Sequence, residues 1–326
     1  MPITLSKDEL LGRINGTCLT PLDQELVVYT DASDFFALDR GNILILGGNG
    51  YLIRGNTREG RFGLDDEVKF WVKRATDLAT GALKIIKIPF FEKFNAHIAG
   101  LTYECYRSPG KESRILQLVA EHPNFMHGIS LADDKDNNVR VMEFIHGPSL
   151  ADYVASLDLD HERYFHEAFA PIFEGYLECV RAIAFLHGHL EKHGDIRRDH
   201  VLIDRDTGRY RWIDFDYNYR HRENMFGYDL FGLGNILAYI VGHGDVTVQD
   251  VRRDKPALFD TLWGEDLNII FRNRVMNLAK IFPYIPRSLN EVLRHFSPGA
   301  NYHYENTSQF LDDLEEAKID LVGCWT

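Results

Sequence analysis

The chain has 326 residues, enough for one large domain or for two lobes. Apolar residues make up 45% of it and charged residues 26%, a balance typical of globular proteins, which excludes a disordered, collagen-like or coiled-coil chain. Its 36 basic and 49 acidic residues give a net charge of −13, so we expect no general affinity for nucleic acid or for anionic membranes.

The cysteines and the N-terminal sequence indicate the cellular compartment of the protein. Cys18, Cys105, Cys179 and Cys324 are far apart and form no CxxC pair, so we expect reduced thiols. The first ten residues lack the basic and apolar regions of a signal peptide. No stretch approaches the roughly 20 apolar residues of a membrane span. We therefore expect a soluble, cytoplasmic protein.

The first third of the chain is predicted to form mainly strands. Apolar runs at 43–46 and 51–53 flank Gly47-Gly48-Asn49-Gly50, where the Asn-Gly pair predicts a hairpin turn. A helix is predicted at 112–120, because its apolar residues recur at helical spacing. Further strands are predicted at 68–72, 83–88, 125–131 and 139–145.

After Gly147-Pro148 the pattern becomes helical, with helices predicted at 172–190, at 228–241 and onward to about 317. A short strand pair at 201–203 and 210–213 interrupts them. We therefore predict a strand-rich first lobe and a helical second lobe, and a cleft between two lobes is a common ligand site. The predicted parts are an N-terminal extension packed on the first lobe (1–40), the first lobe (41–146) and the second lobe (147–326).

Two carboxylates are predicted to lie at the ends of adjacent strands. Asp195 begins a polar loop that leads into the strand at 201–203, and Asp214 directly follows the strand at 210–213. One carboxylate can accept a hydroxyl proton, while the other can hold a divalent cation on phosphate oxygens.

These residues resemble the protein-kinase-like superfamily, and the pattern is most similar to the bacterial relatives of eukaryotic Ser/Thr kinases. Asp195 matches the Asp of the His-Arg-Asp motif, and Asp214 matches the metal-binding Asp of Asp-Phe-Gly. The similarity runs in order over about residues 43–318. It implies an α+β, two-lobed fold, with an antiparallel sheet and one helix in the N-lobe and a mainly helical C-lobe. It also implies ATP, Mg²⁺ or Mn²⁺, and a hydroxyl acceptor that is either a protein or a small molecule.

The resemblance assigns further residues around the nucleotide. Lys87 matches the phosphate-binding Lys, and Glu112 is placed to pair with it. Glu143 and Ile145 lie in the segment that resembles the hinge, whose backbone would meet the adenine edge. Asp229 matches the Asp that anchors the catalytic loop from a long buried helix.

Two stretches could supply the glycine loop that covers the phosphates. One is 46–51, and the other contains Gly60, Phe62 and Gly63. The second is favoured, because it leaves fewer residues before Lys87 and places an aromatic side chain between glycines.

Three positions depart from the superfamily pattern while keeping possible roles in transfer. His200 stands where kinases place a metal-binding Asn; a similar His occurs in lipopolysaccharide-core sugar kinases, and imidazole prefers softer ions than Mg²⁺. The alternative is a His that only donates hydrogen bonds within the loop. Asp216 is either a second metal carboxylate or a turn residue. Arg197 either stabilises the transferring phosphoryl group or is a solvated loop residue.

Two departures concern control and acceptor choice. Gly194 replaces the Arg that usually receives a phosphorylated activation segment, so we expect this control to be absent. Only fifteen positions separate Asp214 from Asp229, and no Ala-Pro-Glu occurs between them. This shortness argues against ordinary peptide phosphorylation.

We therefore expect an ATP-dependent phosphotransferase in which Asp195 and Arg197 act on the acceptor and the phosphoryl group, while Asp214, His200 and Asp216 hold the metal. The alternatives are a pseudokinase that serves as a nucleotide-binding regulatory module, a small-molecule or sugar kinase, and a nucleotidyl transferase on the same fold. His200 and the short segment favour the pseudokinase, whereas the presence of all four main site residues disfavours it. Those four are Lys87, Glu112, Asp195 and Asp214.

Overall fold

A computed structural model describes residues 2–13, 25–59, 67–98, 101–220 and 224–323. The chain divides into two compact units. Unit 1 comprises 1–92, 107–121 and 126–145, and unit 2 comprises 93–106, 122–125 and 146–326. No helix in the described ranges is long and apolar enough to cross a membrane.

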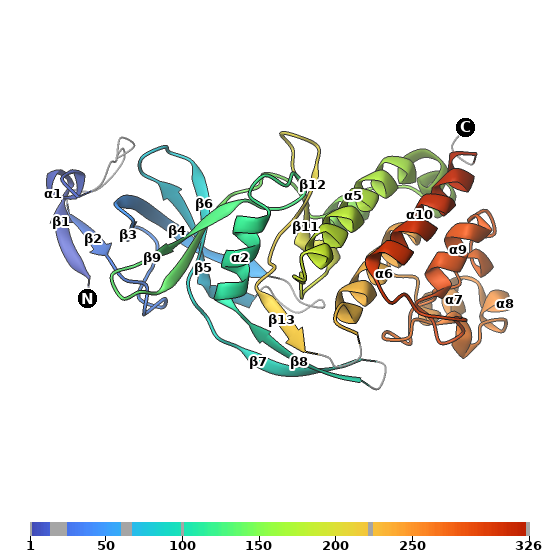
Figure 1. Cartoon of the computed structure of the whole chain (residues 1–326). Coiled ribbons are helices and arrows are strands. Elements are labelled where there is room, and N and C mark those ends of the chain that lie inside the picture. Colours follow the sequence, from blue (N-terminus) through green and yellow to red (C-terminus); the bar gives the residue numbers. More distant parts are fainter. Residues whose placement is uncertain (1, 14–24, 60–66, 99–100, 221–223, 324–326) are drawn as a thin grey trace. The chain divides into compact units, whose positions relative to one another are not determined.

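Unit 1 is built on a sheet of eight described strands in the order β1-β2-β3-β4-β5-β6-β10-β9 (Figure 1). Its pairs are antiparallel apart from β2 and β3, which run parallel. Helices α1 (Lys7–Leu11) and α2 (Pro109–Leu118) belong to the same unit. The strands are β1 (Ile3–Ser6), β2 (Glu25–Tyr29), β3 (Ile43–Leu46), β4 (Asn49–Glu59), β5 (Glu67–Asp77), β6 (Leu83–Lys87), β9 (Gly128–Ala132) and β10 (Asn138–Glu143).

The first forty residues extend this sheet. Strands β1 and β2 add to its β3 edge, and a separate apolar cluster forms beneath them from Leu10, Val28 and Ile43. Ser6 caps α1, and the Glu9 carboxylate accepts the Ser6 backbone N–H in return, so the short helix starts at a defined residue. The extension is thus part of the unit 1 sheet.

The predicted Asn-Gly turn is wrong by two residues. Asn49 and Gly50 already pair with β3 as the first residues of β4, and Gly47 and Gly48 form the turn, with φ of +55° and +78°. Two consecutive positive φ values define the hairpin turn whose twist suits the strands, and glycine adopts them without steric cost. The stretch 46–51 is therefore a sheet turn.

Two other predicted boundaries shift for local reasons. Helix α2 begins at Pro109 and not at 112, because the Ser108 hydroxyl accepts the Lys111 N–H and proline suits the first helical position. Strand β9 begins at Gly128 and not at 125. Phe125 instead forms a bridge with Trp212 and belongs to unit 2.

Unit 2 is mainly helical and contains two small sheets (Figure 1). One sheet pairs β11 (Val201–Ile203) with β12 (Tyr210–Trp212). The other has the order β13-β8-β7, with β7 at Lys93–Ile98, β8 at Leu101–Arg107 and β13 at Tyr217–Arg220. The helices are α3 (Leu150–Ala155), α4 (His161–Arg163), α5 (Phe169–Gly188), α6 (Gly227–Val241), α7 (Val248–Asp254), α8 (Pro256–Phe259), α9 (Arg287–Arg294) and α10 (Thr307–Val322).

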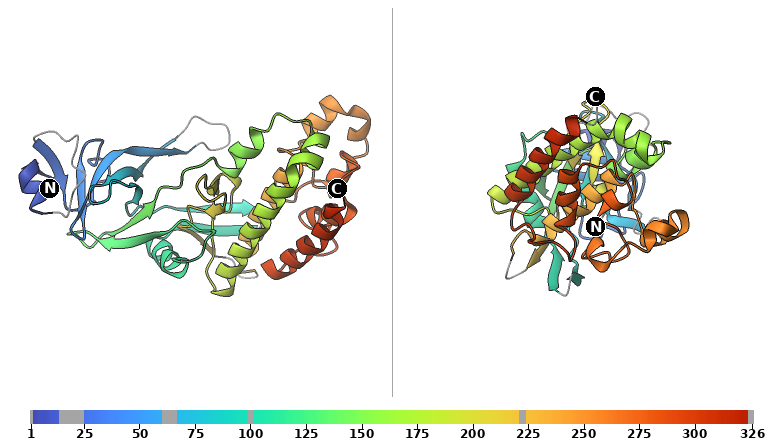
Figure 2. Two further views of the ribbon diagram at one scale, coloured as in Figure 1. Left: turned by 90° about the horizontal axis from the view of Figure 1, so that it is seen from above. Right: turned by 90° about the vertical axis from the view of Figure 1, so that its right-hand side faces the viewer.

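Helix α5 is the central element of unit 2. Its apolar face, including Phe173, Tyr176 and Leu177, is fully buried, as the spacing of apolar residues predicts. Helix α10 packs along it (Figure 2), and the Lys318 ammonium lies 2.7 Å from the Glu174 carboxylate across that contact. This packing supports the elements that carry the site described below.

His161 at the start of α4 is a partly buried histidine whose ring nitrogens both have partners. Nε2–H donates to the Val241 carbonyl (2.9 Å), which leaves Nδ1 to accept the Tyr284 hydroxyl (2.7 Å). The ring stacks on Phe282 at 3.4 Å. Burial lowers the pKa of His161 to about 4 and outweighs the opposing hydrogen bond to Val241.

Acidification is expected to destabilise the protein through His161. The folded pKa of about 4 lies below the ordinary 6.5, so between these values the unfolded chain binds more protons. The stabilisation is complete above pH 6.5 and is lost as the pH falls toward 4. At pH 5 the loss in the free energy of unfolding is about 1 kcal/mol, once partial exposure of the ring is allowed for. Melting temperatures of the parent and His161→Gln at pH 7.5 and 5 measure this. An equal gap between the two proteins at both pH values contradicts it.

Candidate functional site

Unit 1 contains a buried triad of charges at the end of β6. The Lys87 ammonium lies 2.7 Å from the Glu112 carboxylate, as expected from the sequence. Arg140 faces Lys87 across the β6–β10 pair, and its Nε donates to the other Glu112 oxygen at 3.0 Å. Side-chain exposures are 5%, 0% and 1% for Lys87, Glu112 and Arg140. Together the three groups carry one net positive charge, which suits an anionic ligand.

Asp229 shapes the loop that carries Asp195. Its carboxylate is fully buried in the first turn of α6 and accepts the backbone N–H groups of His193 (2.8 Å) and Gly194 (2.9 Å). His187 on α5 approaches the same carboxylate at 3.1 Å. The loop therefore has a fixed backbone immediately before Asp195, as the sequence predicts for an anchoring aspartate.

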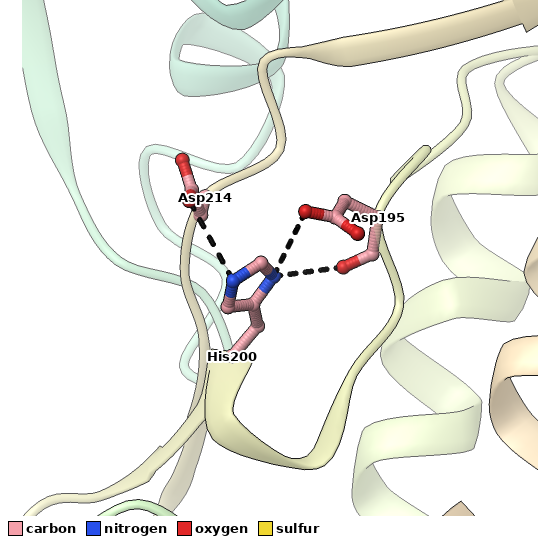
Figure 3. A group of neighbouring side chains, drawn as sticks. All are labelled: Asp195, His200 and Asp214. Atoms are coloured by element: carbon pink, nitrogen blue, oxygen red, sulfur yellow. Dashed lines mark hydrogen bonds and ion pairs between the residues drawn. The ribbon is translucent and has the colours of Figure 1, made fainter. Parts of the chain in front are cut away.

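Asp195, His200 and Asp214 form a cluster within unit 2 (Figure 3). His200 Nδ1 lies 2.8 Å from the Asp195 backbone carbonyl, and this nitrogen is the donor because a carbonyl only accepts. Nδ1 also lies 3.6 Å from the Asp195 carboxylate, and Nε2 lies 3.6 Å from that of Asp214. In the neutral ring Nε2 is then an electron-pair donor that faces a carboxylate oxygen.

This arrangement can hold a metal ion. One ligand atom each from Asp195, His200 and Asp214 lie within 4.8 Å of one another. Two electron-pair donors that face each other repel unless a cation or a proton lies between them, and an imidazole oriented by a carbonyl is the usual form of a histidine ligand. Asp216, which the sequence offers as a further ligand, is buried, and its carboxylate lies within 4.8 Å of that of Asp214, although it is not in the group that contains His200.

The backbone around Asp214 is unusual. Its φ is +63°, a conformation shared by four non-glycine residues in the described ranges, and aspartate tolerates it better than most side chains. Phe215 next to it is fully buried, and its ring lies 6.1 Å from the rings of both His193 and Phe125. His193 and Phe215 therefore act as packing residues. With this backbone conformation, the Asp214 carboxylate lies 3.6 Å from His200 Nε2.

Arg197 has a partner that the sequence interpretation missed. Its Nε donates to the Asp199 carboxylate at 3.0 Å, and a second nitrogen of the guanidinium contacts the same group. The side chain is about a quarter exposed. Asp199 thereby fixes the position of Arg197 two residues after Asp195. The sequence signal that could have predicted this ion pair is an aspartate two residues after an arginine in a polar loop.

The nucleotide contacts predicted for the hinge and the glycine loop are not tested by the described residues. Glu143 links β10 to the start of β9, because its N–H donates to the His127 carbonyl (3.0 Å) and its carboxylate accepts the His127 N–H (2.6 Å). Ile145 is buried. Contact of this segment with adenine stays a prediction. Gly60, Phe62 and Gly63 lie outside the described residues, in the connection between the paired strands β4 and β5.

Gly194 allows the loop before Asp195 to contact β13. Its φ is +87°, and a Cβ atom at this position would lie 1.9 Å from the Tyr217 carbonyl oxygen. Every other residue type would overlap that oxygen. The glycine that replaces the expected arginine therefore has a structural reason, namely that the backbone of β13 occupies the space beside it.

Comparison with known proteins identifies related sequences. No protein-family model matches the chain. Human protein kinase C delta type is 34% identical over 116 residues, which make up 36% of this chain and 16% of that protein. The putative serine/threonine-protein kinase B of Trypanosoma brucei brucei is 27% identical over 106 residues, 32% of this chain and 24% of that protein. The matched stretches thus span under a quarter of these relatives' lengths.

A solved structure extends the similarity over most of the chain. The kinase PK-1 of Cydia pomonella granulovirus matches with a TM-score of 0.53 and 15% identity, covering 81% of this chain and 93% of that one. The protein therefore has a protein-kinase-like fold, and the predicted α+β class with a helical second part is confirmed. Part of its sequence is similar to serine/threonine protein kinases.

Proposed function

We propose that the protein is an ATP-dependent phosphotransferase that transfers the γ-phosphoryl group to a hydroxyl acceptor. The observation that carries this proposal is the cluster of Asp195, His200 and Asp214 on a protein-kinase-like fold. In the transfer, the acceptor oxygen forms a bond to the γ-phosphorus, and the bond from that phosphorus to the β-phosphate oxygen breaks, which releases ADP.

Asp195 is the residue that takes the acceptor proton. Its carboxylate is partly exposed and therefore reachable, and the Asp229 contacts fix the backbone just before it. A carboxylate at this place orients the hydroxyl and accepts its proton as the new P–O bond forms. Arg197, held by Asp199 in the same loop, supplies positive charge to the phosphoryl oxygens.

Asp214 and His200 would hold the divalent ion, with Asp216 as a further carboxylate nearby in the chain. A bound Mg²⁺ or Mn²⁺ neutralises charge on the phosphate oxygens. An imidazole ligand shifts the preference away from Mg²⁺, whose favoured ligands are oxygens, and toward Mn²⁺. We therefore propose that Mn²⁺ supports turnover at least as well as Mg²⁺.

Lys87 would bind the nucleotide phosphates. Glu112 holds its ammonium at the end of β6, Arg140 binds the other oxygen of the same carboxylate, and the triad's net positive charge favours an anion there. Glu143 and Ile145 would present their backbone to adenine, and Gly60, Phe62 and Gly63 would cover the phosphates. These assignments follow from the kinase resemblance and stay proposals.

Replacing Asp195 with asparagine is expected to lower the rate of γ-phosphate transfer or release by about 10²–10⁴-fold, the usual contribution of a positioned general base. ATP with Mn²⁺ should still raise the melting temperature, because the metal ligand Asp214 and Lys87 are retained. The assay uses γ-labelled ATP and the purified protein. Asp206→Asn, in the exposed β11–β12 turn, is the matched control and should keep the parental rate.

Two outcomes contradict the proposal. If ATP and metal stabilise both the parent and the Asp195 variant without any turnover, the protein is a pseudokinase, the alternative that His200 and the short segment favour. If label from α-labelled ATP reaches an acceptor, the protein is a nucleotidyl transferase. With γ-transfer established, a screen of sugars, other small alcohols and proteins distinguishes the acceptor classes.

A further inference from the structure

The strand that follows Asp214–Asp216 is paired with the β7–β8 hairpin. Strand β13 lies beside β8, the second strand of the β7–β8 hairpin, in the small sheet of unit 2 (Figure 1). All four residues of β13 contact hairpin side chains. The contacts are Tyr217 with Phe94 (ring centroids 5.8 Å apart), Asn218 Nδ2 with the Tyr106 hydroxyl (3.1 Å), Tyr219 with Tyr103 (centroids 6.0 Å apart) and Arg220 with Glu104 (3.6 Å).

The catalytic loop and α6 also contact β13. The Lys192 ammonium donates to the Tyr219 carbonyl (2.9 Å) and lies 4.3 Å from the centre of the Tyr219 ring. The Tyr219 hydroxyl accepts the backbone N–H of Asp229 (3.4 Å). The Tyr217 carbonyl fills the space that a side chain at Gly194 would need. Tyr217 and Tyr219 are accordingly buried.

These contacts need no phosphate. At the position where kinases keep an arginine for a phosphorylated segment, this chain has Gly194, and the nearby Lys192 is engaged with the backbone and ring of Tyr219. Aromatic pairs, a strand pairing and a hydrogen-bonded ammonium hold β13 whether or not any residue is modified.

The hairpin, β13 and α6 share one buried cluster. Cys105 of β8 is buried in it with Tyr103 and Tyr219, and Tyr228 of α6 packs against it. Burial, together with the negative charge of Asp195, raises the pKa of the Cys105 thiol to about 11.

We propose that the β7–β8 hairpin is a permanent clamp, which holds β13 against the catalytic loop and so keeps Asp214 and Asp216 in position without phosphorylation. Phe94, Tyr103 and Tyr106 are its positioning residues. They act through β13 and not on the substrate. The proposed effect on turnover rests on the proposed function, whereas the clamping itself does not.

The test uses the full chain after phosphatase treatment, with mass spectrometry to verify that it carries no phosphate. Amide hydrogen exchange of residues 217–220 reports the clamp, and turnover with γ-labelled ATP and Mn²⁺ reports its consequence. Phe94→Ala removes one aromatic contact from a partly exposed position, and Tyr103→Ala removes a buried one. Phe91→Ala, three residues before Phe94 and 78% exposed, is the matched control.

We expect dephosphorylated parent protein to be fully active and residues 217–220 to be protected from exchange. Phe94→Ala should exchange about three- to tenfold faster there, the effect of one aromatic pair on a local opening equilibrium. Its kcat should fall by a similar factor while KM for ATP stays unchanged, and exchange outside residues 217–220 should stay parental, a pattern that general destabilisation does not produce. Phe91→Ala should match the parent.

Four results would each contradict part of the proposal. Parental exchange at 217–220 in both hairpin variants overturns the clamp, as does a parent protein that is active only when phosphorylated. Faster exchange with unchanged kcat overturns the proposed role in turnover. A parent protein without turnover whose residues 217–220 are protected, with protection lost in Phe94→Ala, supports the clamp and overturns the proposed function instead.

Discussion

Replacing Glu112 with glutamine is expected to lower the melting temperature of the protein by about 10 °C. Glu112 is the carboxylate that the buried Lys87 and Arg140 share, at 2.7 and 3.0 Å. Glutamine keeps the shape but removes the charge, which leaves two buried cations facing a neutral amide. Removing one partner of a buried ion pair costs about 3–5 kcal/mol, and each kcal/mol moves the melting temperature by about 2–4 °C in a domain of this size.

Calorimetry of the parent, Glu112→Gln and Glu121→Gln measures the effect. Glu121 is an exposed glutamate just after α2, so its variant should melt within about 2 °C of the parent. Adding Arg140→Met to Glu112→Gln removes one of the two uncompensated cations and should recover part of the loss. A Glu112 variant as stable as the control contradicts the buried triad.

Replacing Gly194 with alanine is expected to abolish measurable phosphotransfer, with a loss of at least about 100-fold. The new Cβ would lie 1.9 Å from the Tyr217 carbonyl oxygen, and a backbone atom in a paired strand does not move aside cheaply. Either β13 or the loop before Asp195 has to shift, and a misplacement of 1 Å can cost about 10²-fold in rate. The positive φ adds a smaller strain of about 1 kcal/mol.

Gly208→Ala is the control that separates the steric overlap with Tyr217 from the backbone strain of a positive φ. Gly208 also has a positive φ, +70°, but a Cβ there meets nothing within 4 Å. Its variant should lose about 1 kcal/mol of stability and keep its activity. Hydrogen exchange at residues 217–220 should rise in Gly194→Ala and stay parental in Gly208→Ala. If both variants behave alike, the contact between Gly194 and Tyr217 does not matter for function.

Local motifs made much of the site predictable from the sequence. Asp195, Asp214 and Asp229 lie in short stretches that follow one another in the order expected from the kinase resemblance, and the contacts of Asp229 agree with the anchoring role predicted for it. Arg140 was missed. The available signal was a charged residue between two apolar ones, Val139 and Val141, because a charge in a buried strand needs a partner. Its partner, Glu112, is known only once β6, β10 and α2 are packed together.

The β7–β8 hairpin was missed although its strands carry a local signal, because polar and apolar side chains alternate over 93–98 and over 101–105. What local patterns do not give is the strand with which the hairpin pairs. Its partner strand, β13, lies more than a hundred residues later, and sequence periodicity carries no information on pairing over such distances. The turn at Gly47-Gly48 was missed for a different reason, because two adjacent glycine-containing pairs both satisfy the turn rule and only the strand register selects one.

The N-terminal strands change which surface of the sheet is open to pairing with other chains. Without them, the apolar strand β3, whose Ile43 and Leu44 are fully buried when β1 and β2 are present, would have unpaired backbone groups along its edge. Strands β2 and β1 cover that edge, and the sheet then ends on β1, a four-residue strand. A short terminal strand is a poor template for further strands. The extension therefore protects the protein against edge-to-edge aggregation.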